Sequence, residues 1–126
     1  MLVLTQKSRE VAAEVVYERA AQDAKWGQQN HPDGTGPDVT VWIEQVTPTE
    51  AEPQRRTAHA FRAADLADGM RQRCKRAPEE GGDTYERILT EEWAEALAES
   101  DPARLRAELI QVAAVAVAWI EAIDRR

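Results

Sequence analysis

The clearest structural pattern in this chain lies in residues 85–111, which read YERILTEEWAEALAESDPARLRAELIQ. Apolar residues recur at helical spacing on both sides of Asp101 and Pro102, and aspartate followed by proline is typical of a helix start. The pattern predicts one helix over about 83–100 and a second over about 102–123. Because the turn between them is short, we expect the two helices to pack as antiparallel neighbours.

Glutamates are concentrated in these two helices. Glu92 and Glu95 are three residues apart and share one face of the first helix, while Glu108 lies early in the second. Antiparallel packing would bring these carboxylates and the amide oxygen of Gln111 to similar height. Several oxygen ligands suit Mg²⁺, which keeps water molecules that substrate phosphates replace. The sequence therefore predicts a Mg²⁺ site, with Mn²⁺ as the alternative ion.

The spacing Glu91-Glu92-x-x-Glu95, followed by Glu108-x-x-Gln111, resembles the EExxE…ExxD motif of the MazG-like all-α nucleoside triphosphate pyrophosphohydrolases. The resemblance covers about a third of the chain. It implies an all-α, antiparallel four-helix bundle that hydrolyses a nucleoside triphosphate, or a related nucleotide, to monophosphate and pyrophosphate. It also implies that Glu92, Glu95 and Glu108 hold the metal, and that Glu91 or Glu92 takes the proton of the attacking water.

Gln111 stands where the family has an aspartate, and three interpretations stay open. The amide oxygen coordinates without a charge, and Asp65, Asp68 or Asp124 supplies the missing carboxylate. Alternatively the site is degenerate, and the chain is a non-catalytic helical module that binds a nucleotide or a protein partner. In the third interpretation Gln111 is structural, and its amide finds a hydrogen-bond partner within the apolar helix.

Glu92, Glu95 and Glu99 form an acidic stripe on the first of these two helices, and this stripe also has a simpler interpretation. It would be a solvated helix face with Arg104 and Arg106 as partners, although like charges one turn apart cost about 0.2–0.5 kcal/mol per pair. A transition-metal site is not expected, because His31 and His59 have no further His or Cys at ligand spacing.

The N-terminal part is predicted to hold a helix over about 5–25, which ends at Trp26-Gly27. A long loop over about 27–46 follows, dense in glycine, proline and asparagine. Within it, residues 39–43 alternate as a strand does, but a single strand would have no partner.

A second helix is predicted from the capping-box pattern at residues 47–50. It starts near Thr47 or, because Pro53 interrupts the pattern, near Gln54, and it ends near Arg76.

Candidates for substrate contacts follow from residue type alone. A base would stack on Trp26. Stacking on Trp42 is open too. In the simpler interpretation all four tryptophans lie in the core or in an interface, and these are Trp26, Trp42, Trp93 and Trp119. The candidates for the phosphates are Lys25, Arg55, Arg56 and Arg62.

The composition bounds the function. A chain of 126 residues predicts a single helical domain over 1–126, and its net charge of −7 argues against a general nucleic-acid binder. The lone Cys74 excludes a disulfide within the chain, no export signal opens it, and residues 109–120 are too few to span a bilayer. We therefore expect a cytoplasmic protein away from membranes, and a homodimer or homotetramer built on the apolar last helix.

Overall fold

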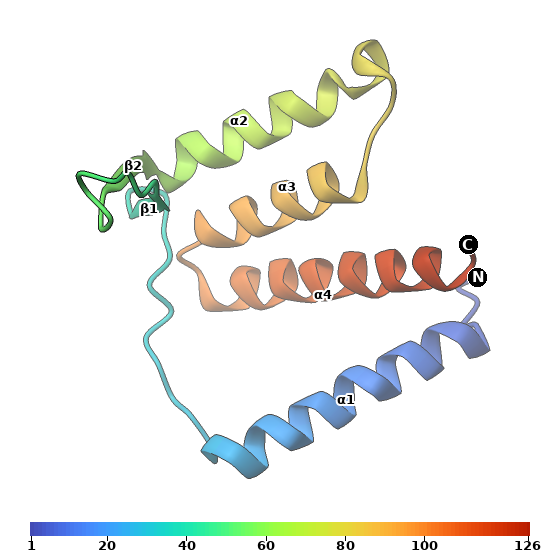
Figure 1. Cartoon of the computed structure of the whole chain (residues 1–126). Coiled ribbons are helices and arrows are strands. Elements are labelled where there is room, and N and C mark those ends of the chain that lie inside the picture. The colour runs from blue at the N-terminus through green and yellow to red at the C-terminus, as the bar shows by residue number, and fades with distance from the viewer.

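The computed structural model describes every residue from Met1 to Arg126 and contains four α-helices and one two-stranded sheet (Figure 1). The elements in chain order are α1 (Gln6–Trp26), β1 (Thr40–Val46), β2 (Arg56–Arg62), α2 (Ala63–Lys75), the short 3₁₀ helix η1 (Ala77–Glu80), α3 (Tyr85–Leu97) and α4 (Pro102–Asp124).

Helices α2, α3 and α4 lie side by side, with α3 in the middle (Figure 1). Leu66 and Ala67 of α2 meet Ala94 of α3 in a small buried core. On the other side of α3, the ring of Tyr85 stacks on Trp119 of α4 with the centroids 5.8 Å apart. The predicted antiparallel packing of the last two helices is confirmed.

The starts of these two helices follow from local sequence. Asp101 accepts a hydrogen bond from the backbone N–H of Arg104 at 3.0 Å, and Pro102 is the first helical residue, as predicted. Thr84 caps α3 in the same way, one residue later than the predicted start at Asp83. The helix also ends earlier than predicted, at Leu97.

Helix α1 contacts chiefly α4, near the two chain ends (Figure 1). Lys7 pairs with Asp124 at 2.7 Å, and the Ser8 hydroxyl donates a hydrogen bond to Glu121. Val11 is buried one turn further on. As predicted, α1 ends before Gly27, whose positive φ of 69° suits glycine. The two helices diverge from the chain ends onwards.

The prediction of a purely all-α four-helix bundle is wrong, because the chain also forms an antiparallel hairpin. Strand β1 pairs with β2 in continuous register from Thr40↔Arg62 to Val46↔Arg56. The predicted loop over 27–46 therefore ends where β1 begins, and α2 starts at Ala63 instead of near Thr47 or Gln54.

The physical reason lies in the cross-strand pairs. Residues 56–62, RTAHAFR, contain two alanines and no helix breaker, so they read locally as helix. In the fold their backbone groups are satisfied by β1, and Val41 lies opposite Phe61 as an aromatic–β-branched pair. The apparent capping box lies in the hairpin connection instead. The backbone N–H of its first threonine, Thr47, donates a hydrogen bond to the carbonyl of Arg55, and the Thr49 hydroxyl accepts one from the backbone N–H of Glu52.

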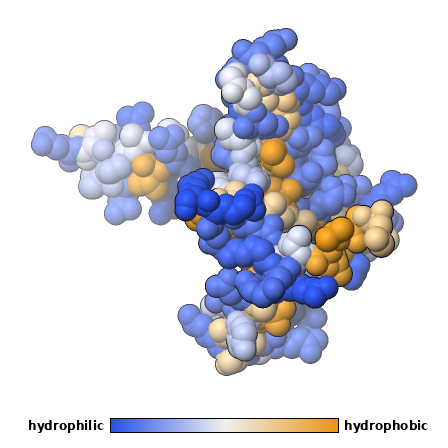
Figure 2. Space-filling model, turned by 90° about the vertical axis from the view of Figure 1, so that its right-hand side faces the viewer, coloured by the Kyte–Doolittle hydropathy of each residue, from blue (hydrophilic) through white to orange (hydrophobic).

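Burial is low throughout this structure. Only nine residues of the chain are buried, and Figure 2 shows hydrophobic side chains at the surface. Trp26, Trp42 and Trp93 have large exposed fractions, so the expected core positions are not found for them within a single chain. No helix combines the length and the apolar character needed to cross a membrane.

Candidate metal centre

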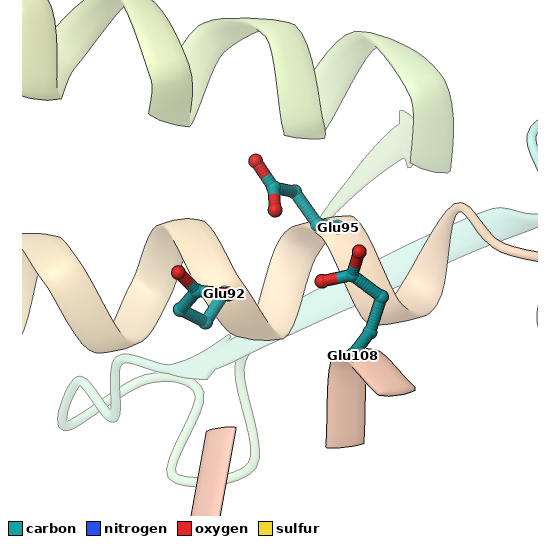
Figure 3. A group of neighbouring side chains, drawn as sticks. All are labelled: Glu92, Glu95 and Glu108. Atoms are coloured by element: carbon teal, nitrogen blue, oxygen red, sulfur yellow. The ribbon is translucent and has the colours of Figure 1, made fainter. Parts of the chain in front are cut away.

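Three glutamates meet where α3 lies against α4. Glu92 and Glu95 come from successive turns of α3, and Glu108 comes from the second turn of α4 (Figure 3). One carboxylate oxygen from each lies within 4.8 Å of the other two. The structure thus brings together the three carboxylates that the sequence selected as metal ligands.

The burial of these carboxylates leaves polar atoms without partners. One oxygen of Glu92 and one of Glu108, the Oε2 atoms, are shielded from solvent and accept no hydrogen bond. An unpaired buried polar atom costs roughly 1–3 kcal/mol, and more when it is charged. A proton or a cation beside these oxygens would offset this cost.

Glu92 and Glu95 respond to this environment by holding their protons more tightly. Burial, and then the charges of Glu108 and Glu91, raise the pKa of Glu92 above its ordinary value. The pKa of Glu95 is raised by burial and by the charges of Glu92, Glu108 and Glu91, against a smaller lowering by Arg71. A divalent cation would relieve the same repulsion.

An open groove of about 260 Å³ lies beside the cluster. Its walls are Arg71 of α2, Glu95 and the adjoining Ala98 and Glu99, and Glu108 of α4. Arg71 is the one basic residue of this lining, with its Nε 3.8 Å from Glu95 Oε1. The groove therefore offers room for a small ligand next to the carboxylates.

Arg71 is a site residue that the sequence interpretation missed. It lies four residues after the buried Ala67 and therefore on the α2 face that packs toward α3. The available signal was an arginine beside the apolar residues of α2 that face the core. The signal was missed because the predicted start of α2 was wrong.

Glu91 lies on the side of α3 that faces α2. It lies near Cys74 of α2. The pKa of the Cys74 thiol is raised to about 12, mainly by burial and then by the neighbouring Glu91 carboxylate. Glu91 is outside the three-carboxylate group, yet its charge acts on Glu92 and Glu95.

Gln111 is exposed on α4, one turn after Glu108. Within a single chain the amide of Gln111 therefore faces solvent. It does not need a hydrogen-bond partner from the protein, as a buried glutamine would. The three aspartates considered as substitutes each form an ion pair and are not part of the three-carboxylate group, although the partner of Asp68 is the groove residue Arg71. Asp65 pairs with Arg62, Asp68 with Arg71 and Asp124 with Lys7.

The arginines expected to partner the acidic stripe are placed differently. Arg104 and Arg106 are exposed on α4 and form no ion pair with the three glutamates. The cluster is half-buried and largely unneutralised, which distinguishes it from an ordinary solvated face.

The candidate substrate-binding residues lie on other elements. The ammonium of Lys25 sits 4.8 Å from the ring centroid of Trp26 at the end of α1. Arg62 is held by Asp38 and Asp65 at the base of the hairpin, whereas Arg55 and Arg56 lie at its far end. Six residues of strand separate that end from the base, about 20 Å. A substrate role for these residues stays a prediction.

Comparisons with protein family models, curated proteins and solved structures find no match to this chain. The likeness to the pyrophosphohydrolases thus rests on the motif residues alone.

Proposed function

We propose that this chain is a Mg²⁺-dependent hydrolase that converts a nucleoside triphosphate, or a related nucleotide, to the monophosphate and pyrophosphate. The observation that supports this most is the convergence of Glu92, Glu95 and Glu108 within 4.8 Å. It combines with two shielded oxygens that lack any partner.

The donor set fits Mg²⁺ on chemical grounds. Carboxylate oxygens are hard ligands, and three of them leave positions for water and for phosphate oxygens. When bound, Mg²⁺ would supply positive charge against the negative charge that develops as the phosphoanhydride bond breaks. The ligands would be Glu92, Glu95 and Glu108.

The neighbouring residues have roles that follow from their chemistry. Glu92 or Glu91 would accept the proton of the attacking water. The raised pKa of Glu92 matches this step near neutral pH better than an ordinary carboxylate does. Arg71 would bind a phosphate oxygen, since its guanidinium lines the groove. A nucleotide substrate and the free thiol of Cys74 agree with a cytoplasmic enzyme.

The test of the metal site is calorimetric titration of Mg²⁺ and Mn²⁺, with and without a non-hydrolysable triphosphate. The variant is Glu92→Gln/Glu95→Gln, which keeps side-chain shape and removes two charges. The control is Glu44→Gln/Glu50→Gln on the hairpin side of the chain, which removes the same charge. We expect binding in wild type and control, and at least tenfold weaker binding in the variant. Equal binding in all three proteins would refute the site.

A non-catalytic module is the second candidate, favoured by the uncharged and exposed Gln111. Turnover of any nucleoside triphosphate, abolished by Glu95→Ala and retained by Glu50→Ala, would eliminate it. Gln111→Asp separates the two further, because it restores the family's carboxylate. Tighter Mg²⁺ binding or a gain of turnover would mark a site weakened by this one substitution, whereas no change would assign Gln111 to another role.

A further inference from the structure

The surface of this chain is larger than that of a compact monomer of its mass. A folded monomer of this mass exposes about 6,700 Å², whereas this chain exposes 9,675 Å². The excess is about 2,900 Å², and each partner in a standard protein interface buries about 800 Å². Even if the projecting hairpin took up half of the excess, the remainder would satisfy a stable interface.

The apolar part of this excess is concentrated where α1 and α4 diverge. Val11 of α1 is 1% exposed, but Val15, one turn later on the same face, is 43% exposed. On α4, Val117 is half-buried, but Ile110, two turns earlier on the same face, is 53% exposed. The apolar faces of α1 and α4 that meet near the chain ends thus continue along both helices into a region where neither face is covered.

We call this region the open face and define it by Val15, Leu109, Ile110 and Ala113, all of which are exposed. Helix α4 carries no charged residue from Leu109 to Ile120. Depletion of charge is the compositional mark of an interface core, and a helix that is apolar nearly all round is normally buried.

We propose that the open face is covered by the same face of a second copy of this chain, in a two-fold symmetric dimer. Each copy brings the uncharged stretch of α4 and needs the same covering, so one interface satisfies both. An uncharged centre also keeps the net negative charges of the two chains away from the contact. The excess surface matches an interface of this kind in extent.

The dimer would bring the second copy close to the candidate metal centre. Leu109 belongs to the open face and directly follows Glu108, which lines the carboxylate groove. A partner helix over Leu109 therefore runs beside that groove. The dimer does not depend on the proposed catalysis, because its evidence is surface area and apolar exposure.

The test is sedimentation equilibrium of the full chain from low to high micromolar concentration. We expect a dimer for the wild type, and at least tenfold weaker association for Ile110→Asp, because a charge would enter an apolar contact. The matched control is Val46→Asp on the hairpin, where an equally exposed apolar residue receives the same charge. It should associate like the wild type.

Circular dichroism shows whether Ile110→Asp is folded, and Val15→Lys is the second variant if it is not. A wild type that does not self-associate at any concentration overturns the proposal, and so does one whose open face binds a different protein instead of a second copy. So does a dimer that both open-face variants leave intact. A larger assembly supports the proposal if these variants break it into smaller species, and contradicts it if they do not. Neither Mg²⁺ binding nor turnover enters this readout.

Discussion

At Glu92, burial and neighbouring charge act together against ionisation. The pKa is raised in the folded state, so the folded chain keeps this proton to a higher pH than the unfolded chain does. The contribution of the group to stability is therefore present below the ordinary carboxyl pKa of about 4.3, and it is lost as pH rises through the raised value. In the absence of metal, the ionised cluster destabilises the fold at neutral pH.

We accordingly predict that Glu92→Gln raises the melting temperature at neutral pH by a few degrees when a chelator is present. The difference from wild type should vanish below about pH 4, where the carboxyl is protonated in both states. Thermal denaturation followed by circular dichroism measures this, with Glu50→Gln as the exposed control. A lower melting temperature for Glu92→Gln at neutral pH would show that the ionised carboxylate is stabilising.

Cys74 gives a second prediction at this scale. A pKa of about 12 keeps the thiol protonated, and thiol reactivity follows the thiolate. We expect alkylation at pH 8 to be at least tenfold slower in the native chain than in urea, as read by mass spectrometry of the single cysteine. Glu91→Gln should accelerate the native reaction only in part, because burial is the larger cause. Equal native and unfolded rates would contradict this.

Local signals at single residues were the part of the structure that the sequence predicted best. Asp101 and Pro102 start α4, and Gly27 ends α1, because caps depend on a few adjacent residues. The exposure of Trp42 or Trp93 was not predictable in this way, because burial depends on which distant elements come together.

Among the elements, the hairpin is attached to the helices at its base, where β2 runs directly into α2. Val41 packs against the core that Leu66, Ala67 and Ala94 form, whereas Val46 is 58% exposed at the other end of the same strand. We predict that Val41→Ala lowers the free energy of unfolding by about 1–2 kcal/mol, through the loss of buried methyl groups. Val46→Ala should change it by less than about 0.5 kcal/mol.

Urea denaturation of both variants measures this contrast. Equal losses would mean that the hairpin is stabilised by its own cross-strand pairs more than by its attachment to α2 and α3.

The hairpin also shows where inference from a single sequence ends. The alternating residues 39–43 indicated a strand, but the partner strand carried a helix-like composition. Strand pairing is a non-local contact between residues 40–46 and 56–62, so it satisfies the backbone against local propensity. By contrast, the α3–α4 pair was predicted because the elements are adjacent in sequence and each has a clear cap. The three-carboxylate cluster follows from that pair.

For the whole molecule, helical spacing identified α4 as an apolar helix but did not say which of its faces another element would cover. Leu109, one turn after the buried Leu105, and Ile123, one turn after the half-buried Trp119, have large exposed fractions in the single chain. An apolar sequence predicts that a helix is buried. It does not show whether the covering surface comes from the same chain or from another copy. The predicted homo-oligomer therefore stays a prediction, now assigned to the open face.

If the dimer forms, folding and association are coupled, because part of the burial of α4 would come from the second copy. Any partner that binds only the folded state stabilises it by mass action. The melting temperature of the wild type should then rise with protein concentration, by several degrees over a hundredfold range. Ile110→Asp should melt lower and with a weaker concentration dependence, whereas Val46→Asp should follow the wild type. Differential scanning fluorimetry in a chelator separates this effect from metal binding, and a wild-type melting temperature that is independent of concentration would show that α4 is stable in the folded monomer.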